Sequence, residues 1–234
     1  MFRNLKFKID SFTSYRRDPF QRLNQLLSQF EQPTIVDVGA NVGQFGVDLR
    51  RTGYKGRILS FEPVSDIYKT LCQTASRSND WECFNFGFGA RNETLEMNIS
   101  KNDGLSSSLL KMHGNHEIFF GDATYVSKEM VRIRTIDSVF NELYIDVTQA
   151  LLKLDIQGYE SFALAGAVNT LKLVPYCFLE VSIMKLYEGE SSILSILNQL
   201  NESNHQIIDL YPGLVTGDGK LIQVDILTSS IEIL

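Results

Sequence analysis

The chain has 234 residues, a length that suits one domain with a sizeable core. Its net charge of −6 provides no basic field for nucleic acid, and no stretch is long and apolar enough to span a bilayer. The three cysteines are irregularly spaced and form neither a disulfide framework nor a metal pattern. These features favour a globular protein of a reducing, cytoplasmic compartment.

The first 32 residues are predicted to form a basic arm and a helix, and residues 33–234 one domain. The arm has no continuous apolar core of the kind a secretion signal needs. We expect it to be solvated and partly ordered, with a peripheral membrane contact as the alternative. Asp18 and Pro19 then form a typical helix start, a capping residue followed by proline at the first helical position.

A strand that runs into a glycine turn is the strongest local pattern. Residues 35–38 form a short run rich in β-branched residues, as a covered parallel strand requires. Gly39 and Gly43 let the backbone turn sharply and approach a ligand closely, and a helix beginning after the turn would point free N–H groups into it. The spacing departs from the dinucleotide fingerprint, because Asn41 stands where a central glycine would. Asp37 would repel a pyrophosphate but could fix backbone amides or a cationic ligand. We therefore predict a cofactor at Asp37, Gly39, Asn41 and Gly43, with a generic turn as the alternative.

A second strand over residues 57–63 ends in an acid. Glu62 lies 19 residues after Gly43, where an acid in such sheets accepts hydrogen bonds from ribose hydroxyls. Pro63 stops the strand and holds the carboxylate at its carboxyl end. A strand-end glutamate in solvent is the alternative. The third strand, residues 81–89, should end near the adenine, with Asn85 as a polar contact.

Residues 101–128 form a long, polar insertion between the third and fourth core strands. Such a loop in a compact domain is usually functional, so we expect it to line or cover the substrate site. It contains His113 and His116. Because no third ligand stands at matching spacing, we expect surface histidines and not a metal site.

Eight segments together resemble the FkbM family of methyltransferases and occur in the family's order over about residues 33–228. They are DVGANVG (37–43), FEP (61–63), SSSL (106–109), RTID (134–137), LKLDIQGYE (152–160), EVS (180–182), LYEGE (186–190) and QVD (223–225). The resemblance implies an α/β Rossmann-like fold, with a mostly parallel seven-stranded sheet and helices on both faces. It also implies S-adenosylmethionine as methyl donor and O-methylation, often of sugars in glycans or glycosylated natural products. The family commonly has Glu in the place of Gln157, so this residue is not counted as an acid here.

Methyl transfer to a hydroxyl needs in-line alignment and a base or metal that helps to remove the proton. In the usual strand order of methyltransferases the first, fourth and fifth strands are neighbours, so Asp155 and Glu180 would converge on one acceptor or one divalent ion. Lys153 shares the sheet face of Asp155 and is predicted to pair with Asp155 or Glu180. The alternatives are a helix cap for Asp155, a paired core acid for Glu180 and a snorkelling side chain for Lys153.

Three other functions fit parts of the pattern. A nicotinamide-dependent oxidoreductase explains the turn and Glu62 but not the later segments. A cofactor-binding domain without catalysis would not explain why Asp155 stands beside an intact glycine turn. Nucleic-acid methylation conflicts with the acidic charge balance. We expect a small-molecule or glycan acceptor and leave metal dependence and a homodimer open.

Overall fold

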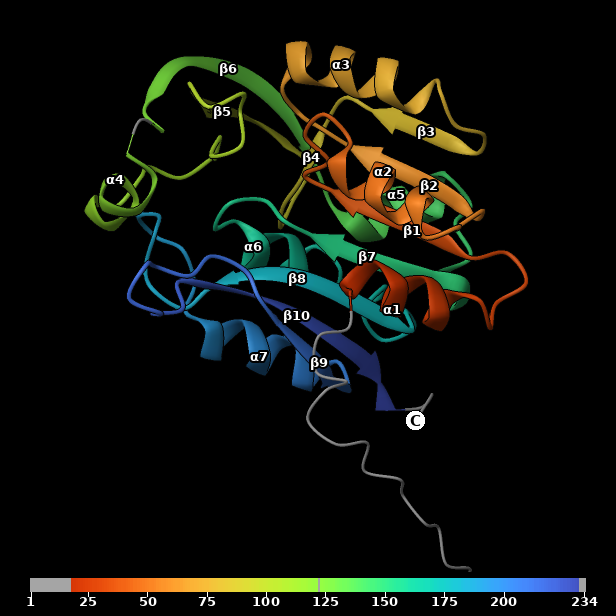
Figure 1. The fold of residues 1–234 in the computed structure, drawn as a ribbon. Helices are drawn as coiled ribbons and strands as arrows, with labels where there is room; N and C mark the ends of the chain where they lie inside the picture. Colours follow the sequence, from red (N-terminus) through yellow and green to blue (C-terminus); the bar gives the residue numbers. More distant parts are fainter. Residues whose placement is uncertain (1–17, 122, 232–234) are drawn as a thin grey trace, which may run out of the picture.

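The computed structural model describes residues 18–121 and 123–231, and it contains a large and a small sheet (Figure 1). The large sheet has the order β3-β2-β1-β7-β8-β10-β9 and the small one the order β4-β6-β5. The strands are β1 (Thr34–Val38), β2 (Arg57–Phe61), β3 (Trp81–Phe84), β4 (Gly87–Phe88), β5 (Glu93–Ser100), β6 (Tyr125–Arg134), β7 (Ala150–Leu154), β8 (Tyr176–Ser182), β9 (His205–Pro212) and β10 (Gln223–Ser230). The helices are α1 (Pro19–Leu27), α2 (Gln44–Arg51), α3 (Ser65–Ala75), α4 (Gly114–Phe120), α5 (Ile136–Glu142), the 3₁₀ helix η1 (Val147–Gln149), α6 (Glu160–Ala165) and α7 (Ile193–Glu202).

The large sheet is mostly parallel, which confirms the predicted Rossmann-like fold. β3, β2, β1, β7 and β8 pair in parallel, and β10 runs antiparallel to both β8 and β9. β1, β7 and β8 are neighbours, as the predicted order of the first, fourth and fifth strands required. The carboxyl ends of these strands therefore meet at one edge of the sheet.

Both faces of the large sheet are covered by helices. Alternate residues of β1 point to opposite faces, so Ile35 packs with Leu23 of α1 and Leu49 of α2, whereas Val36 packs with residues of α5, α6 and α7. Burial on both sides explains why the central strands read as nearly continuous apolar runs. α1 begins where the sequence predicted, because the Asp18 side chain accepts a hydrogen bond from the Phe20 amide at 2.9 Å.

Most of the predicted basic arm lies outside the described residues, and the boundary proposed between residues 32 and 33 stays a prediction. In the part of the chain that the structure describes, no helix combines the length and the apolar composition needed to cross a membrane.

The segment from β4 to β6 builds the small sheet, apart from the large one. In Figure 1, β5, β6 and α4 lie at the upper left, beyond the carboxyl ends of β7 and β8. The predicted third strand is split, since β3 belongs to the large sheet and β4 to the small one. Residues 101–128 are more ordered than a loop, because they include α4 and the beginning of β6.

The predicted surface position of the histidines is wrong for His116. Its side chain is 0% exposed, because the ring stacks on Phe120 with centroids 4.5 Å apart and meets Tyr187 edge-on. His113 is partly exposed and lies 3.9 Å from Glu188. Phe120 is close in the sequence, four residues along the same helix, but Tyr187 comes from a distant segment that the local pattern around His116 does not reveal.

Candidate active site

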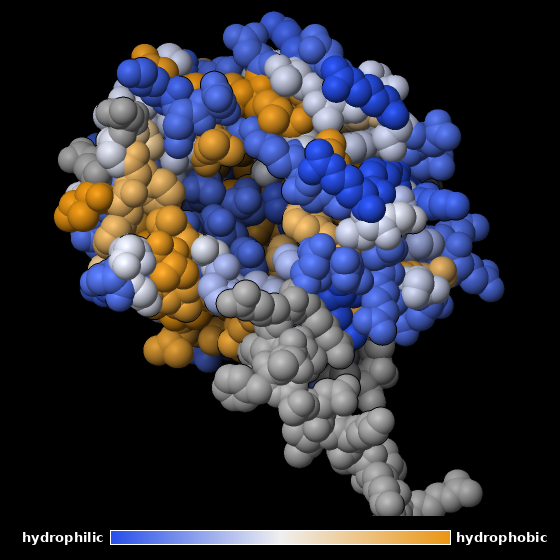
Figure 2. All heavy atoms as spheres, viewed as in Figure 1, coloured by the Kyte–Doolittle hydropathy of each residue, from blue (hydrophilic) through white to orange (hydrophobic). Residues whose placement is uncertain are grey.

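A cavity of about 550 Å³ opens at the carboxyl ends of the central strands. In Figure 2 it appears as a hollow with a hydrophilic floor and hydrophobic residues beside it. The glycine turn, the strand ends and the insertion all contribute to its lining, among them Gly39, Asn41, Glu62, Leu105, Ser106, Asp155 and Glu180.

The glycine turn lies directly against the end of β7. Gly39 has a φ of +73°, and a Cβ atom there would stand 1.9 Å from the carbonyl oxygen of Asp155. A side chain therefore does not fit at this position. Asn41 also has a positive φ, of 47°, and lines the cavity. The amides of residues 39–43 all donate to partners within the protein, so the turn offers a ligand a close approach to its backbone and not free N–H groups of its own. Its role as a cofactor site stays a prediction.

Glu62 is held rigidly on the floor of the cavity. Its side chain is only 5% exposed, and its two oxygens accept hydrogen bonds from the amides of Asn41 at 3.0 Å and Val64 at 2.9 Å. Burial raises the pKa of Glu62 to about 7, although these two amides lower it. The remaining lone pairs can accept hydrogen bonds from ribose hydroxyls, so the residue fits the nucleoside part of a cofactor.

A buried ion pair joins β1 to β7. Asp37 and Lys153 are register partners, and Lys153 Nζ lies 3.0 Å from Asp37 Oδ1 and 3.7 Å from Asp155 Oδ2. Nζ also donates to the Gly39 carbonyl at 3.0 Å, and the Ser60 hydroxyl donates to Asp37 Oδ2 at 3.1 Å. Burial alone would lower the pKa of Lys153, but the carboxylates of Asp37 and Asp155 raise it above its ordinary value. The predicted pairing of Lys153 with Asp155 is confirmed, and the carboxylate nearest to Lys153 is that of Asp37, which was not among the predicted partners.

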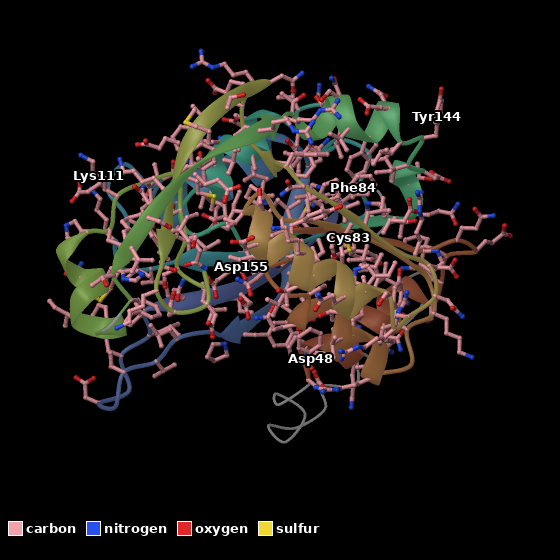
Figure 3. All side chains as sticks on the ribbon, turned by 90° about the horizontal axis from the view of Figure 1, so that it is seen from above. Asp48, Cys83, Phe84, Lys111, Tyr144 and Asp155 are labelled. Carbon is pink, nitrogen blue, oxygen red and sulfur yellow. The ribbon has the colours of Figure 1, made fainter. Side chains whose placement is uncertain are left out.

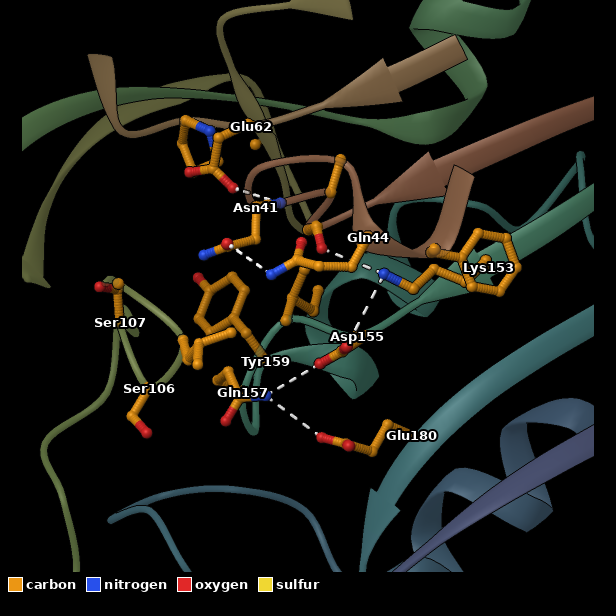
Figure 4. Close-up of a pocket in the computed structure, with 18 of the residues that line it drawn as sticks. Asn41, Gln44, Glu62, Ser106, Ser107, Lys153, Asp155, Gln157, Tyr159 and Glu180 are labelled. Atoms are coloured by element: carbon orange, nitrogen blue, oxygen red, sulfur yellow. Dashed lines mark hydrogen bonds and ion pairs between the residues drawn. The ribbon is translucent and has the colours of Figure 1, made fainter. Parts of the chain in front are cut away.

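Two carboxyl groups face each other across an amide. The side-chain nitrogen of Gln157 donates to Asp155 Oδ1 at 2.9 Å and to Glu180 Oε2 at 3.2 Å (Figure 4). Gln223 on β10 donates to the same oxygen of Glu180 at 2.8 Å. Burial raises the pKa of Glu180 well above its ordinary value, and the charges of Asp155 and Asp225 add to this. Glu180 therefore holds its proton more strongly than an exposed glutamate.

Asp225 completes this edge of the cavity. Burial and the charge of Asp155 raise the pKa of Asp225 to about 6. In Figure 3, Asp155 lies near the centre of the view, whereas Lys111 and Tyr144 project at its edges.

The cavity brings together most of the predicted site residues, but three remain outside its lining. The lining includes Gly39, Asn41, Glu62, Pro63, Lys153, Asp155 and Glu180. Asp37 is fully buried behind Lys153, and Gly43 forms the N-cap of α2. The side-chain amide of Asn85 donates to the carbonyls of Glu62 and Pro63, at 3.0 Å each. It therefore holds the backbone directly after β2 without lining the cavity itself.

Sequence reasoning gave no role to Gln157, Gln223 or Asp225. The signal was present in β10, since residues 223 and 225 of a strand share one face. It went unused because β10 pairs with β8 from a distant part of the chain. Among the described residues, no group of three or more His, Cys, Asp or Glu side chains is arranged to hold a metal ion.

Comparisons with known proteins agree with this geometry. The model of the methyltransferase FkbM domain matches residues 37–207. The 2-O-methyltransferase NoeI of Sinorhizobium fredii (strain NBRC 101917 / NGR234) is 25% identical over 226 residues, which cover 92% of this chain and 91% of that protein.

A solved structure of low sequence identity shares the fold, and a second is less similar. An rRNA methylase from Streptococcus thermophilus matches with a TM-score of 0.50 and 11% identity, over 92% of this chain and 98% of that one. Magnesium protoporphyrin IX methyltransferase from Synechocystis PCC 6803, solved with its methyl donor bound, has a TM-score of 0.48 and 11% identity, over 90% of this chain and 77% of that one.

Proposed function

The chain belongs to the FkbM methyltransferase family and uses S-adenosylmethionine, and from this premise we propose that it methylates a hydroxyl group of a sugar in a glycan or glycosylated natural product. The observation that carries the proposal is a single cavity with two ends. Glu62 and Asn41 lie toward one end and Glu180 toward the other, with Asp155 between them and beside Gly39 of the glycine turn (Figure 4). A donor and an acceptor can therefore meet inside it.

At the first end, the residues fit the methyl donor. Glu62 would accept hydrogen bonds from its ribose, and Gly39 and Asn41 would leave room for it along the turn. When bound, S-adenosylmethionine supplies a methyl group on a positively charged sulfur, which leaves as a neutral thioether. The acidic side chains of the cavity suit this positive charge.

At the second end, Asp155 and Glu180 take different parts. We assign Asp155 to accept the proton of the acceptor hydroxyl, whose oxygen then forms the new bond to the methyl carbon. Lys153 at 3.7 Å and the Gln157 amide at 2.9 Å hold this carboxylate in place. Burial raises the pKa of Glu180, so it stays protonated at higher pH and can donate a hydrogen bond to the acceptor. Because the two carboxyl groups have different environments, one can accept a proton while the other donates a hydrogen bond.

Three features support a sugar as acceptor. Asp155, Glu180 and Asp225 offer the carboxyl groups that bind hydroxyls, and the aromatic side chains of Phe45 and Phe178 line the same cavity. The name of the relative NoeI states that it methylates an oxygen.

The test is an acceptor screen. The purified protein is incubated with S-adenosylmethionine and a panel of neutral glycosides and oligosaccharides, and mass spectrometry detects the gain of one methyl group. Asp155→Asn should lower kcat by roughly a hundredfold and leave the affinity for S-adenosylmethionine unchanged, because it removes a base and keeps the shape.

Asp146→Asn is the matched control, since this residue caps η1 before β7 and its variant should keep full activity. Normal turnover by Asp155→Asn would overturn the assignment, and failure to methylate any glycoside would reject the sugar acceptor. Loss of wild-type activity with a chelator would replace the direct base with a metal-assisted step.

A further inference from the structure

A chain of buried hydrogen bonds connects the insertion to Asp155 and Glu180. His116 Nε2 on α4 lies 3.2 Å from the hydroxyl of Tyr187, which lies 2.8 Å from Oε1 of Gln157. The other end of the Gln157 amide contacts the two carboxyl groups. His116 and Tyr187 are both 0% exposed, so water does not compete for these bonds.

The direction of each bond in this chain follows from the groups involved. A tyrosine hydroxyl has one proton, and an amide oxygen only accepts. The Tyr187 hydroxyl therefore donates to Gln157, and His116 Nε2 must carry the proton that it donates to the Tyr187 oxygen. Burial raises the pKa of Tyr187, so the hydroxyl remains a donor. Because Oε1 is taken, the NH₂ end of Gln157 must point at Asp155 and Glu180.

The backbone of Gln157 is held in an unfavourable conformation. Its φ is +55°, in the left-handed region that residues other than glycine rarely adopt. The Ser108 hydroxyl donates to its carbonyl oxygen at 2.7 Å. Ser108 and His116 both belong to the insertion. This segment therefore contacts the backbone of Gln157 directly and its side chain through Tyr187.

We propose that Gln157 is a positioning residue, oriented by Tyr187 and His116, that fixes which oxygens of Asp155 and Glu180 face the acceptor. The proposal rests on the proposed function of Asp155. Under this proposal the insertion does more than line the cavity. Its contacts with Gln157 and Tyr187 also set the arrangement of the two carboxyl groups. The family commonly has Glu at this position, and a glutamate would bridge two carboxyl groups only when protonated, whereas the amide of Gln157 offers its two N–H bonds without titrating.

The charged and titratable groups around Gln157 come from every element packed against it. They are Lys153 of β7, Asp155 directly after β7, Glu160 of α6, Glu180 of β8, Tyr187 and Glu190 of the segment after β8, Asp225 of β10 and His116 of α4. Five of the eight are carboxyl groups, so a further negative charge at position 157 would be repelled.

Tyr187→Phe tests the proposal against Tyr125→Phe. Tyr125 lies in the insertion, whereas Tyr187 follows β8, and the Tyr125 hydroxyl donates to the Leu110 carbonyl at 2.8 Å and not to Gln157. Tyr187→Phe should lower kcat/KM for the best glycoside of the screen about tenfold, mainly through kcat, with the Kd of S-adenosylmethionine within about twofold. Tyr125→Phe should leave all three unchanged. Equal kcat/KM in the two variants would overturn the proposal.

Two further measurements keep the proposal testable if Tyr187→Phe folds poorly or no glycoside reacts. In Gln157→Glu, the ratio of variant to wild-type kcat/KM should fall as the pH rises from about 6 to about 9, because the new carboxyl group loses its bridging proton. A ratio independent of pH would contradict the positioning role.

The side-chain amide protons of Gln157, followed by NMR without any acceptor, should exchange with solvent about tenfold faster in Tyr187→Phe than in Tyr125→Phe. Exchange at the same rate would contradict the orientation by Tyr187. A wild-type protein that methylates no glycoside but shows this difference would reject the proposed acceptor alone.

Discussion

The two ends of the cavity are built in different ways. The cofactor end comes from residues 37–63, one strand–turn–helix and the next strand, and its key acid is held by backbone amides. The acceptor end comes from β7, β8, β10 and the insertion, and it is held by bonds between side chains. A site made by local backbone geometry can be recognised in a sequence, whereas one made by side chains of distant segments depends on how those segments pack.

The two ends are joined at two places. The Gly39 turn touches the backbone of Asp155, and the insertion reaches both ends. Asn41 donates from its side chain to the Asp103 carbonyl at 3.2 Å, and Ser108 donates to Gln157. The insertion was predicted to cover the substrate site, and the structure shows that it also contacts the glycine turn. We therefore expect most substitutions to impair either cofactor binding or acceptor turnover. At these two contacts a substitution should impair both.

The largest effect is expected at Gly39, where both ends should fail together. In Gly39→Ala the new Cβ would meet the Asp155 carbonyl, and the alanine would also adopt a positive φ. We expect the free energy of unfolding to fall by about 3 kcal/mol or more. We also expect the variant to lose S-adenosylmethionine binding. Chemical denaturation and calorimetry measure the two quantities.

Gly53→Ala is the control, since its φ is +93° but its Cβ would meet nothing within 4 Å. It should cost only about 1 kcal/mol and leave binding intact. If both variants lost stability and binding equally, the cause would be the backbone strain of a positive φ and not the contact of position 39 with the Asp155 carbonyl.

A smaller effect, confined to the cofactor end, is expected at Glu62. Glu62→Ala should weaken S-adenosylmethionine binding by about 1–3 kcal/mol, since it removes the ribose acceptor and the partner of two amides. At saturating donor, kcat should change little. Glu62→Gln keeps one acceptor oxygen and should lose less. Unchanged affinity of Glu62→Ala in calorimetry would reject the ribose assignment.

The smallest effect concerns stability at the acceptor end. Glu160 is buried, accepts from the Ile156 amide at 2.9 Å and has its pKa raised by burial from 4.5 to about 7. The folded protein therefore binds this proton more tightly than the unfolded chain. Its stabilising effect is complete below about pH 4.5 and is lost as the pH rises through about 7.

Glu160→Gln keeps an acceptor oxygen but does not titrate, so stability should fall less steeply over this pH range. Thermal unfolding at several pH values measures the slope. Glu202→Gln, at an exposed position of α7, should retain the wild-type slope. An unchanged slope in Glu160→Gln would show that other groups cause the pH dependence.

Much of the fold could be predicted because its signals are local. Alternation and β-branched runs identified the central strands, Asp18 and Pro19 marked the start of α1, and Glu62 was found from its distance to the glycine turn. Burial and partner choice were harder. His116 was expected at the surface and lies in the interior, and Lys153 pairs with Asp155 as expected but lies closer still to Asp37. In both cases the deciding neighbour comes from a segment that the local sequence does not reveal.

The sequence by itself determined the strand–turn–helix, the acid after β2 and the family, since each depends on residues close together or on segments in a fixed order. The tertiary structure alone decided the register that sets Lys153 opposite Asp37, and the packing of α4 that brings His116 and Tyr187 to Gln157. The physical reason is that a buried polar group must find a partner among whichever side chains surround it, and only the folded chain fixes which those are.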